Sequence, residues 1–437
     1  MATTVIEIAE EKQFFVGVRA NRRALFRGSS TNDERPESTD ARIKTACSAM
    51  SAVYGGDGDE KCSRQLDLWR ESLGVLIFVA LFFETDDKSH LWRAEELVER
   101  VHDSLGRTSD GEALAADADD CGQCPTAGGL RVGVGKRFEP SAELKARVEK
   151  EADEHSEPLA STEFTVAHGT ISAESCNVLW ALALLRLARA SASRRYEACA
   201  LALLRRTHDA FVRDVDCRAT RENYVLVERL RTFQLRHYLS VDSNVASASR
   251  GRRSRLQTVT DQADVFLGFG VFHVGCAATS AGVKVERALD ALRDVVPPLC
   301  RWFCDDDSAW FLAHTLLGAR LSADDGLLLP VQRKALAVVA AIRPELDRRS
   351  PFFETDCTNT TRLFCRRLPH AELLLAFALR LLPAVVLEEA GIKGLDDDIL
   401  HVWTQTEVGR GMVANDTYAM VVLALLAVGG RVFLGRF

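Results

Sequence analysis

Residues 168–211 read HGTISAESCNVLWALALLRLARASASRRYEACALALLRRTHDAF, and this stretch decides the fold class. Its first part, Ile171–Arg189, is apolar on almost every side, so a helix there must be covered by several neighbours. A short turn, Ser191–Ser193, follows. In the second part the apolar side chains fall on one face at helical spacing: Tyr196, Cys199, Ala200, Leu203, Leu204, Thr207 and Phe211. The stretch therefore predicts a helical hairpin with one helix inside and one at the surface.

Helical patterns recur in pairs along the rest of the chain, and no segment alternates as a strand would. The predicted helices are Cys62–Phe83, Leu91–Leu105, Ser141–Glu154, Glu222–Leu239, Thr258–Ala278, Lys284–Cys304, Ser308–Leu321, Val331–Ile342, His370–Leu387, Asp396–Val408 and Met412–Val428. Together with the hairpin at 168–211 they predict an all-α protein of roughly a dozen helices, closed into a ring of about six hairpins. Gly106 follows the second of these helices, and we expect it to end that helix with a positive φ.

The sequence pattern indicates one domain with an N-terminal extension. Residues 1–60 are weakly patterned and are interpreted as an N-terminal extension, and residues 61–437 as one helical domain. A polar insertion, Arg107–Pro140, is long for a compact protein, which is typical of a functional or disordered loop. The apolar runs 73–83 and 418–428 are shorter than the roughly 20 residues that span a bilayer, so they predict core helices.

Composition restricts the partners and the compartment. The net charge of -7 and the pI near 5.9 argue against a general nucleic-acid-binding protein. Met1–Glu11 is mixed and acidic and lacks the pattern of a secretory signal, and the 12 cysteines are mostly scattered singly on apolar helices. We therefore expect a cytoplasmic protein with reduced thiols and no membrane partner. The sequence does not indicate an oligomeric state.

Two segments carry a resemblance to a known superfamily. The first is Leu97–Arg107 followed by Pro125–Gly133, which reads PTAGGLRVG. The second is His168-Gly169 ahead of the hairpin helices that contain Trp180 and Tyr196. With the paired helices, these segments resemble the (α/α)6 toroids of the six-hairpin glycosidase-like superfamily, and most of all an uncharacterised bacterial family with a P-T-A-G-G-L-R-I-G segment. The resemblance implies a toroid whose site lies in a funnel at one end of the inner helices, and a hydrolase or epimerase acting on a sugar or glycoside.

The same resemblance contains a departure that bears on activity. Where that family opens its helix with D-G-Q-Y-F-H, this chain has His168-Gly169-Thr170-Ile171-Ser172-Ala173. The acidic position is therefore His168, and the histidine position is Ala173. If those groups perform chemistry in the relatives, this chain has lost them, so a non-catalytic helical scaffold or interaction protein is the alternative function. Whether the chain is an enzyme stays open at this point.

Glu174 and His168 are the candidate catalytic residues. Glu174 lies one turn into a helix that is otherwise apolar, where burial would raise the pKa of the carboxyl and suit it to act as a general acid. The other interpretation is that it faces a solvent channel or pairs with an arginine. His168 could be a base or could donate a hydrogen bond to a sugar, although a histidine just before a helix more often caps or packs.

His370, Glu372 and Asp416 are the candidate substrate-binding residues. His370 and Glu372 open the apolar run 373–382 and could line the funnel, or simply start a helix. Asp416, with Asn415, starts or interrupts the last helix. Asp396–Asp398 are interpreted as negative charge at a helix N-terminus rather than as metal ligands.

No pattern indicates a metal or a cofactor. Cys121-Gly122-Gln123-Cys124 would need a strand-containing fold to be a redox pair and two more ligands to bind zinc. No glycine-rich segment ends in GK[ST], and G-x-S-x-G is absent. The basic cluster Arg250–Arg255 lacks the interleaved aromatic residues of a nucleic-acid site and is interpreted as a solvated loop.

Overall fold

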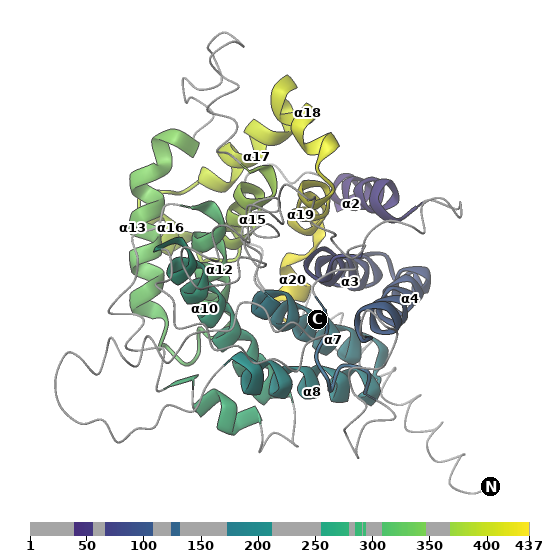
Figure 1. The fold of residues 1–437 in the computed structure, drawn as a ribbon. Coiled ribbons are helices and arrows are strands. Elements are labelled where there is room, and N and C mark those ends of the chain that lie inside the picture. The colour runs from purple at the N-terminus through teal and green to yellow at the C-terminus, as the bar shows by residue number, and fades with distance from the viewer. Residues whose placement is uncertain are drawn as a thin grey trace, which may run out of the picture.

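The computed structural model describes residues 39–55, 66–107, 124–131, 173–211, 255–278, 285–290, 292–293, 308–346 and 368–436 (Figure 1). Helices make up most of this part of the chain, and it contains no strand, which confirms the all-α prediction. The predicted helices Ser141–Glu154 and Glu222–Leu239 lie outside these residues, as do most of the insertion 107–140 and of the basic cluster 250–255.

The hairpin predicted from residues 168–211 is present. Helix α7 (Ala173–Ser191) is buried at every position from Cys176 to Ala188. Ala192 turns the chain with a φ of 54°, and α8 (Arg194–Phe211) follows. Helix α8 buries Tyr196, Cys199, Leu203 and neighbours on one face and exposes Arg206. A helix covered on all sides is thus joined to a helix covered on one side, as the apolar pattern predicts.

Five more helices are buried in the same way as α7. They are α3 (Leu68–Thr85), α10 (Arg255–Ala278), α12 (Ala309–Leu321), α15 (Pro369–Arg380) and α19 (Thr417–Val428). Each packs against the next in the order α3, α7, α10, α12, α15, α19, and α19 packs against α3 again. In Figure 1 these six helices lie towards the inside of the molecule.

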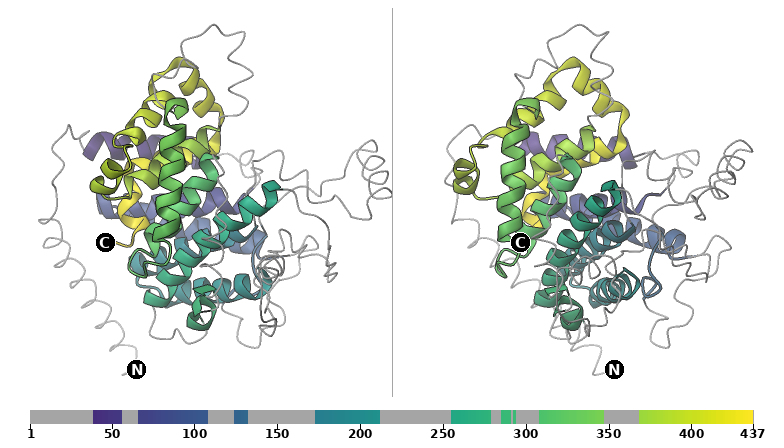
Figure 2. Two further views of the ribbon diagram at one scale, coloured as in Figure 1. Left: turned by 90° about the vertical axis from the view of Figure 1, so that its left-hand side faces the viewer. Right: turned by 60° about the vertical axis from the view of Figure 1, so that its left-hand side comes forward.

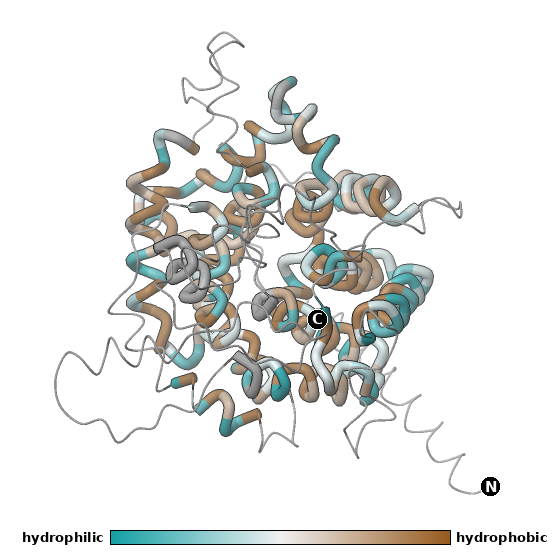
Figure 3. The backbone as a smooth tube through the Cα atoms, in the orientation of Figure 1, coloured by the Kyte–Doolittle hydropathy of each residue, from teal (hydrophilic) through white to brown (hydrophobic). Residues whose placement is uncertain are grey.

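The outer helices each cover one of the inner helices. Helix α4 (Lys88–Leu105) packs on α3, α8 on α7, α13 (Leu329–Leu346) on α12 and α17 (Leu395–Gln405) on α15. When the left-hand side of Figure 1 is turned to the viewer, α13 lies in front of the other helices (Figure 2). Figure 3 shows the difference in polarity, because α19 is mainly hydrophobic and α4 has a hydrophilic face.

Helix α2 (Thr39–Tyr54) was not indicated by the sequence pattern. It lies within the weakly patterned residues 1–60, yet it packs against α19 and α3 and buries Ala46, Met50 and Val53. The packed part of the chain therefore begins before residue 61.

Several helix boundaries differ from the predicted ones, and three of the differences have a local cause. The predicted helix His370–Leu387 is broken at Pro383, so that α15 ends at Arg380 and α16 (Ala384–Glu389) starts anew. Thr406 separates α17 from α18 (Glu407–Asn415), and its hydroxyl accepts a hydrogen bond from the Gly409 N–H. Asp416 then separates α18 from α19, which confirms that it interrupts the predicted helix Met412–Val428.

Gly106 ends α4 as expected, but not in the expected conformation. Its φ is −80° rather than positive. Glycine is needed here for a steric reason instead, because a Cβ at this position would overlap the His102 carbonyl oxygen. The prediction of a left-handed residue at Gly106 was wrong.

The last helix, α20 (Gly430–Phe433), lies against the second halves of α15 and α7. Its Phe433 packs against Phe377 of α15, with ring centroids 5.4 Å apart. Arg186 of α7 donates a hydrogen bond to the Phe433 carbonyl at 2.8 Å. Phe377 and Arg186 lie in the second halves of their helices, so the candidate site described below is at the opposite end.

No single helix in the described ranges has the length and hydropathy needed to cross a bilayer; α18 and α19 reach that threshold only as a pair, across a bend of 106°.

Candidate functional site

The first turns of four inner helices meet at one place, although they are far apart in the sequence. We call the residues gathered there the candidate site. They are Asp67, Trp69 and Arg70 of α3, Trp310 and His314 of α12, His370 of α15, and Asp416 and Tyr418 of α19.

Four aromatic rings of the candidate site form a closed series of contacts. The centroid distances are 5.1 Å for Trp69–Trp310, 6.2 Å for Trp310–His370, 5.8 Å for His370–Tyr418 and 5.8 Å for Tyr418–Trp69. These distances are typical of attractive aromatic pairs. One ring comes from each of α3, α12, α15 and α19, so the contacts tie the starts of the four helices together.

The caps of these helices explain why the rings meet. Asp67 caps α3, Ser308 caps α12 and Asp416 caps α19, each by accepting a hydrogen bond from a backbone N–H of the first turn. Helix α15 begins instead with a proline at its first position. In all four helices, the aromatic ring is the second residue after the capping residue. The repeated pattern places each ring at the same height on its helix.

His370 and Asp416 are within hydrogen-bonding distance at the edge of the candidate site. His370 Nδ1 lies 2.9 Å from Asp416 Oδ2, and both side chains are largely but not fully covered. Burial alone would raise the pKa of Asp416, but the hydrogen bond and charge of His370 and two backbone N–H groups outweigh it and lower that pKa. Asp416 is therefore held as a carboxylate.

Asp67 has the opposite electrostatic environment. It is 8% exposed, and burial raises its pKa, against the smaller effects of the Arg70 N–H, the Arg70 charge and a hydrogen bond with Tyr418. The pKa of Tyr418 is also raised, first by burial and then by the neighbouring Asp67. The pKa values of the two aspartates are thus shifted in opposite directions.

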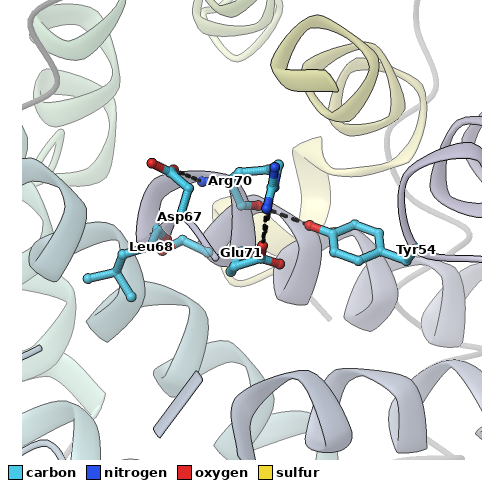
Figure 4. Close-up of polar contacts among 6 residues, drawn as sticks. Tyr54, Asp67, Leu68, Arg70 and Glu71 are labelled. Atoms are coloured by element: carbon cyan, nitrogen blue, oxygen red, sulfur yellow. Dashed lines mark hydrogen bonds and ion pairs between the residues drawn. The ribbon is translucent and has the colours of Figure 1, made fainter. Parts of the chain in front are cut away.

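Arg70 is held beside the site by a buried ion pair (Figure 4). Its Nη2 lies 2.7 Å from Glu71 Oε1, and the Tyr54 hydroxyl donates to the Arg70 carbonyl at 3.3 Å. The guanidinium carbon lies 6.0 Å from the centre of the Tyr418 ring, within range of a cation–π contact. Because Arg70 is paired with Glu71, its guanidinium packs against the Tyr418 ring without adding net charge to the site.

Several polar atoms of the candidate site are buried without a hydrogen-bond partner in the described part of the chain. They are Trp69 Nε1, Trp310 Nε1 and both ring nitrogens of His314. Burial lowers the pKa of His314 to about 3, so its ring is neutral at pH 7. Buried polar groups are almost always paired, with protein or with water, so this concentration in one place requires an explanation.

The sequence-predicted residues are only partly brought together. His370 and Asp416 are in contact within the site. Glu372 is buried two residues further along α15 and accepts a hydrogen bond from Trp403 Nε1 of the outer helix α17 at 2.9 Å. Glu174 lies in the first turn of α7, but its side chain is outside the described residues, as is the whole of His168. One observation links the start of α7 to the site. Cys176, two residues after Glu174, contributes to the raised pKa of Tyr418.

Sequence analysis did not single out Asp67, Trp69, Arg70, Trp310, His314 or Tyr418. A usable signal was nevertheless present. Asp67-Leu68-Trp69, Ser308-Ala309-Trp310 and Asp416-Thr417-Tyr418 each place a capping residue two positions before an aromatic residue at the start of an apolar run. This triplet marks Asp67, Trp69, Trp310 and Tyr418, but it does not mark Arg70 or His314.

The segment that carries the family resemblance has a structural part in the fold. Thr126 Oγ1 donates to the Cys199 carbonyl of α8 at 2.7 Å. The Asn177 side chain of α7 bonds both the N–H and the carbonyl of Leu130. The Arg131 N–H donates to the Leu105 carbonyl at the end of α4. Residues 124–131 therefore join α4, α7 and α8.

Within the described ranges, no three or more His, Cys, Asp or Glu residues are arranged to hold a metal ion. Asp396 and Asp397, which were predicted to supply charge at a helix start, lie in the first turn of α17 and pair with Arg380. Cys124 is partly buried, and Cys121 lies outside the described residues.

Comparison of the chain with protein-family models, with curated proteins and with solved structures gives no match. The function must therefore be argued from the candidate site itself.

Proposed function

We propose that this protein is a carbohydrate-active enzyme, a hydrolase or epimerase, built as an (α/α)6 toroid of the six-hairpin glycosidase-like kind. The observation that carries the proposal is the meeting of four helix starts at one cluster of aromatic rings and ionisable groups. The proposal places the substrate at this end of the inner helices.

The packing order of the helices supports the toroid. Six buried helices contact one another in a closed order, and outer helices cover α3, α7, α12 and α15 in turn. Helix α2 takes the corresponding outer position on α19. In such a ring the inner helices run the same way, which explains why the starts of α3, α12, α15 and α19 lie together.

The chemistry of the site suits a sugar. Binding sites for small molecules combine aromatic walls with a few polar groups that fix orientation. Here four rings provide the walls, and Trp69, Trp310 and His314 provide buried polar atoms that lack a partner among the described residues. The faces of a pyranose are apolar at its C–H groups, and its edge carries hydroxyl groups, so both features of the site have a counterpart.

The two aspartates supply the acid and base. Titratable groups whose surroundings push their pKa values in opposite directions are the mark of an acid–base pair. The raised pKa of Asp67 suits a proton donor to a leaving oxygen, and the lowered pKa of Asp416 suits a base or nucleophile. In an epimerase, the same groups would remove a proton on one side of the sugar and return one on the other. Glu174 is a further candidate from the start of α7.

The alternative is a helical scaffold without catalysis. It is favoured by one observation, namely that Asp67 and Asp416 both cap helices and therefore have a structural reason to be present. The departure at His168 and Ala173 from the related family's helix start points the same way. Turnover discriminates between the two proposals.

The test uses the full chain with aryl glycosides, neutral oligosaccharides and free hexoses, followed by proton NMR. New reducing ends report hydrolysis, and interconversion of hexoses reports epimerisation. We expect D416N and D67N each to lower kcat/KM by about a hundredfold or more, the usual worth of general acid–base groups. D396N is the matched control, because Asp396 is also an aspartate in a helix first turn paired with a cation. No conversion by the wild-type protein, or equal rates for D416N and D396N, would overturn the proposal.

A further inference from the structure

Among the buried tryptophans in the described part of the chain, two have their indole N–H groups hydrogen-bonded and two do not. Trp180 Nε1 donates to His102 Nε2 at 3.1 Å, and Trp403 Nε1 donates to Glu372 Oε2 at 2.9 Å. Trp69 Nε1 and Trp310 Nε1 have no acceptor among the described residues, although Trp69 is fully buried and Trp310 is 6% exposed. Leaving a buried donor unpaired costs about 1–3 kcal/mol. The fold therefore provides an acceptor for Trp180 and for Trp403, but none among the described residues for the two tryptophans of the candidate site.

A third unpaired side chain adjoins these two. His314 is fully buried, and neither of its ring nitrogens has a partner in the described part of the chain. Its ring lies edge-on to Trp310, with centroids 4.2 Å apart and planes at 86°. The Trp69 and Trp310 centroids are 5.1 Å apart. Three adjacent rings therefore hold four unpaired polar atoms.

We propose that Trp69, Trp310 and His314 form a binding subsite for an uncharged hydroxyl group of the ligand. The inference rests on the proposed function, and it names the three side chains that would position the substrate. A hydroxyl accepts two hydrogen bonds and donates one. The two indole N–H groups are donors only, and a neutral imidazole offers one acceptor nitrogen. A hydroxyl group can therefore pair with the two indole N–H groups and with the acceptor nitrogen of His314, and the remaining imidazole N–H is a further donor for the ligand.

The electrostatic surroundings favour an uncharged group over an ionic one. His314 is neutral at pH 7, because burial lowers its pKa to about 3. Arg70, whose guanidinium lies 6.0 Å from the Tyr418 ring centre, is already paired with Glu71. A carboxylate brought into this position would lose its hydration without gaining a counter-charge. We therefore expect neutral sugars to bind and the corresponding uronates to be rejected.

The test observes the indole N–H groups directly in the full chain labelled with ¹⁵N at tryptophan. The probes are D-glucose, D-mannose, D-galactose and D-xylose, with D-glucuronate as the anionic counterpart. We expect at least one neutral sugar to shift the Trp69 and Trp310 indole resonances saturably and to leave Trp180 unchanged. W310F should weaken that sugar's Kd about three- to tenfold, as loss of one hydrogen bond implies.

Thermal unfolding without ligand provides the matched control. Both substitutions remove buried ring volume, but W310F removes an unpaired donor, so its midpoint should fall less than that of W180F. W180F removes a paired donor and leaves His102 without its partner, so its midpoint should fall. A fall for W310F as large as that for W180F would show that Trp310 is already bonded and would overturn the subsite.

The outcomes also separate this inference from the proposed function. D416N is expected to lose turnover and to keep the sugar-induced indole shifts. If no neutral sugar shifts these resonances, or if glucuronate shifts them equally, the subsite is wrong even when turnover is found. If the shifts occur without turnover, the subsite stands as a sugar-binding site and the enzymatic proposal fails.

Discussion

His370 Nδ1 and Asp416 Oδ2 lie 2.9 Å apart, although 46 residues separate them in the chain. The two oxygens of Asp416 have different partners. Oδ1 accepts from the Tyr418 and Ala419 N–H groups and caps α19, whereas Oδ2 faces His370. A single carboxylate thus begins one helix and is joined to the start of another, which ties the position of the ionised group to the packing of α15 against α19.

Two substitutions of Asp416 separate its structural role from its charge. Asparagine is about as good a helix cap as aspartate, whereas alanine is a poor one. We expect D416A to lower the free energy of unfolding by about 1 kcal/mol for the lost cap and by about 1 kcal/mol more for the lost hydrogen bond with His370. D416N should retain most of that stability, while both variants lose turnover. Denaturant unfolding and kcat/KM, measured on the same preparations, check the prediction.

Asp87 offers the control for this comparison. It caps α4 by accepting from the Ser89 N–H at 2.8 Å, and it lies on the surface away from the candidate site. D87A should therefore lose cap stability and D87N should not, with turnover unchanged in both. A loss of turnover in D87A similar to that in D416A would mean that the effect at Asp416 is only a consequence of reduced stability.

Acid should destabilise this protein through buried neutral histidines. Burial lowers the pKa of His314 to about 3, and burial together with the charge of Arg195 lowers that of His102 to about 4. The unfolded chain binds a proton at each near pH 6.5. Below that pH the unfolded state holds more protons, so the free energy of unfolding falls as the pH drops towards 4.

The variant H314Q isolates one of these contributions, because glutamine does not titrate. The loss of stability between pH 6.5 and 4 should be smaller in H314Q than in the wild type, by at most about 1.4 kcal/mol per pH unit. H401Q, at an exposed histidine of α17, should run parallel to the wild type. Parallel curves for the wild type and H314Q would show that His314 is protonated or accessible in the folded protein.

Much of the helical architecture follows from hydrophobic pattern alone. Helix α7 is apolar all round and is buried throughout, and α8 is apolar on one face and is buried on that face. Pattern failed for α2, because its buried residues are few and are spaced among polar ones. It also failed at Pro383, where a single residue interrupts a continuous apolar run. Periodicity reports which side of a helix is covered, not where backbone hydrogen bonds end.

The candidate site was harder to predict, since its parts come from four separate helices. His370 and Asp416 could be singled out as polar residues beside apolar runs, but their contact depends on the packing of α15 with α19. Asp67 could not be placed, because the predicted helix starts at Cys62 and would have made Asp67 an internal residue. The aromatic residues were hidden for another reason: a tryptophan at the start of an apolar helix has the composition of ordinary core.

The contact between α10 and α12 offers a direct test of the closed packing order. Gly318 of α12 lies against the α10 backbone so closely that a Cβ would overlap the Phe266 carbonyl oxygen and lie 2.8 Å from the Leu267 nitrogen. Gly270 of α10 faces the Gly318 backbone in return. Backbone atoms cannot move aside as side chains do, so G318A should cost about 3 kcal/mol or more in unfolding free energy, at or above the usual range for overpacking.

Gly411 of α18 is the control: a Cβ there meets no atom within 4 Å, and alanine should stabilise the helix by about 0.5–1 kcal/mol. Urea unfolding of G318A and G411A measures both, and equal stabilities would show that α10 and α12 are not in backbone contact.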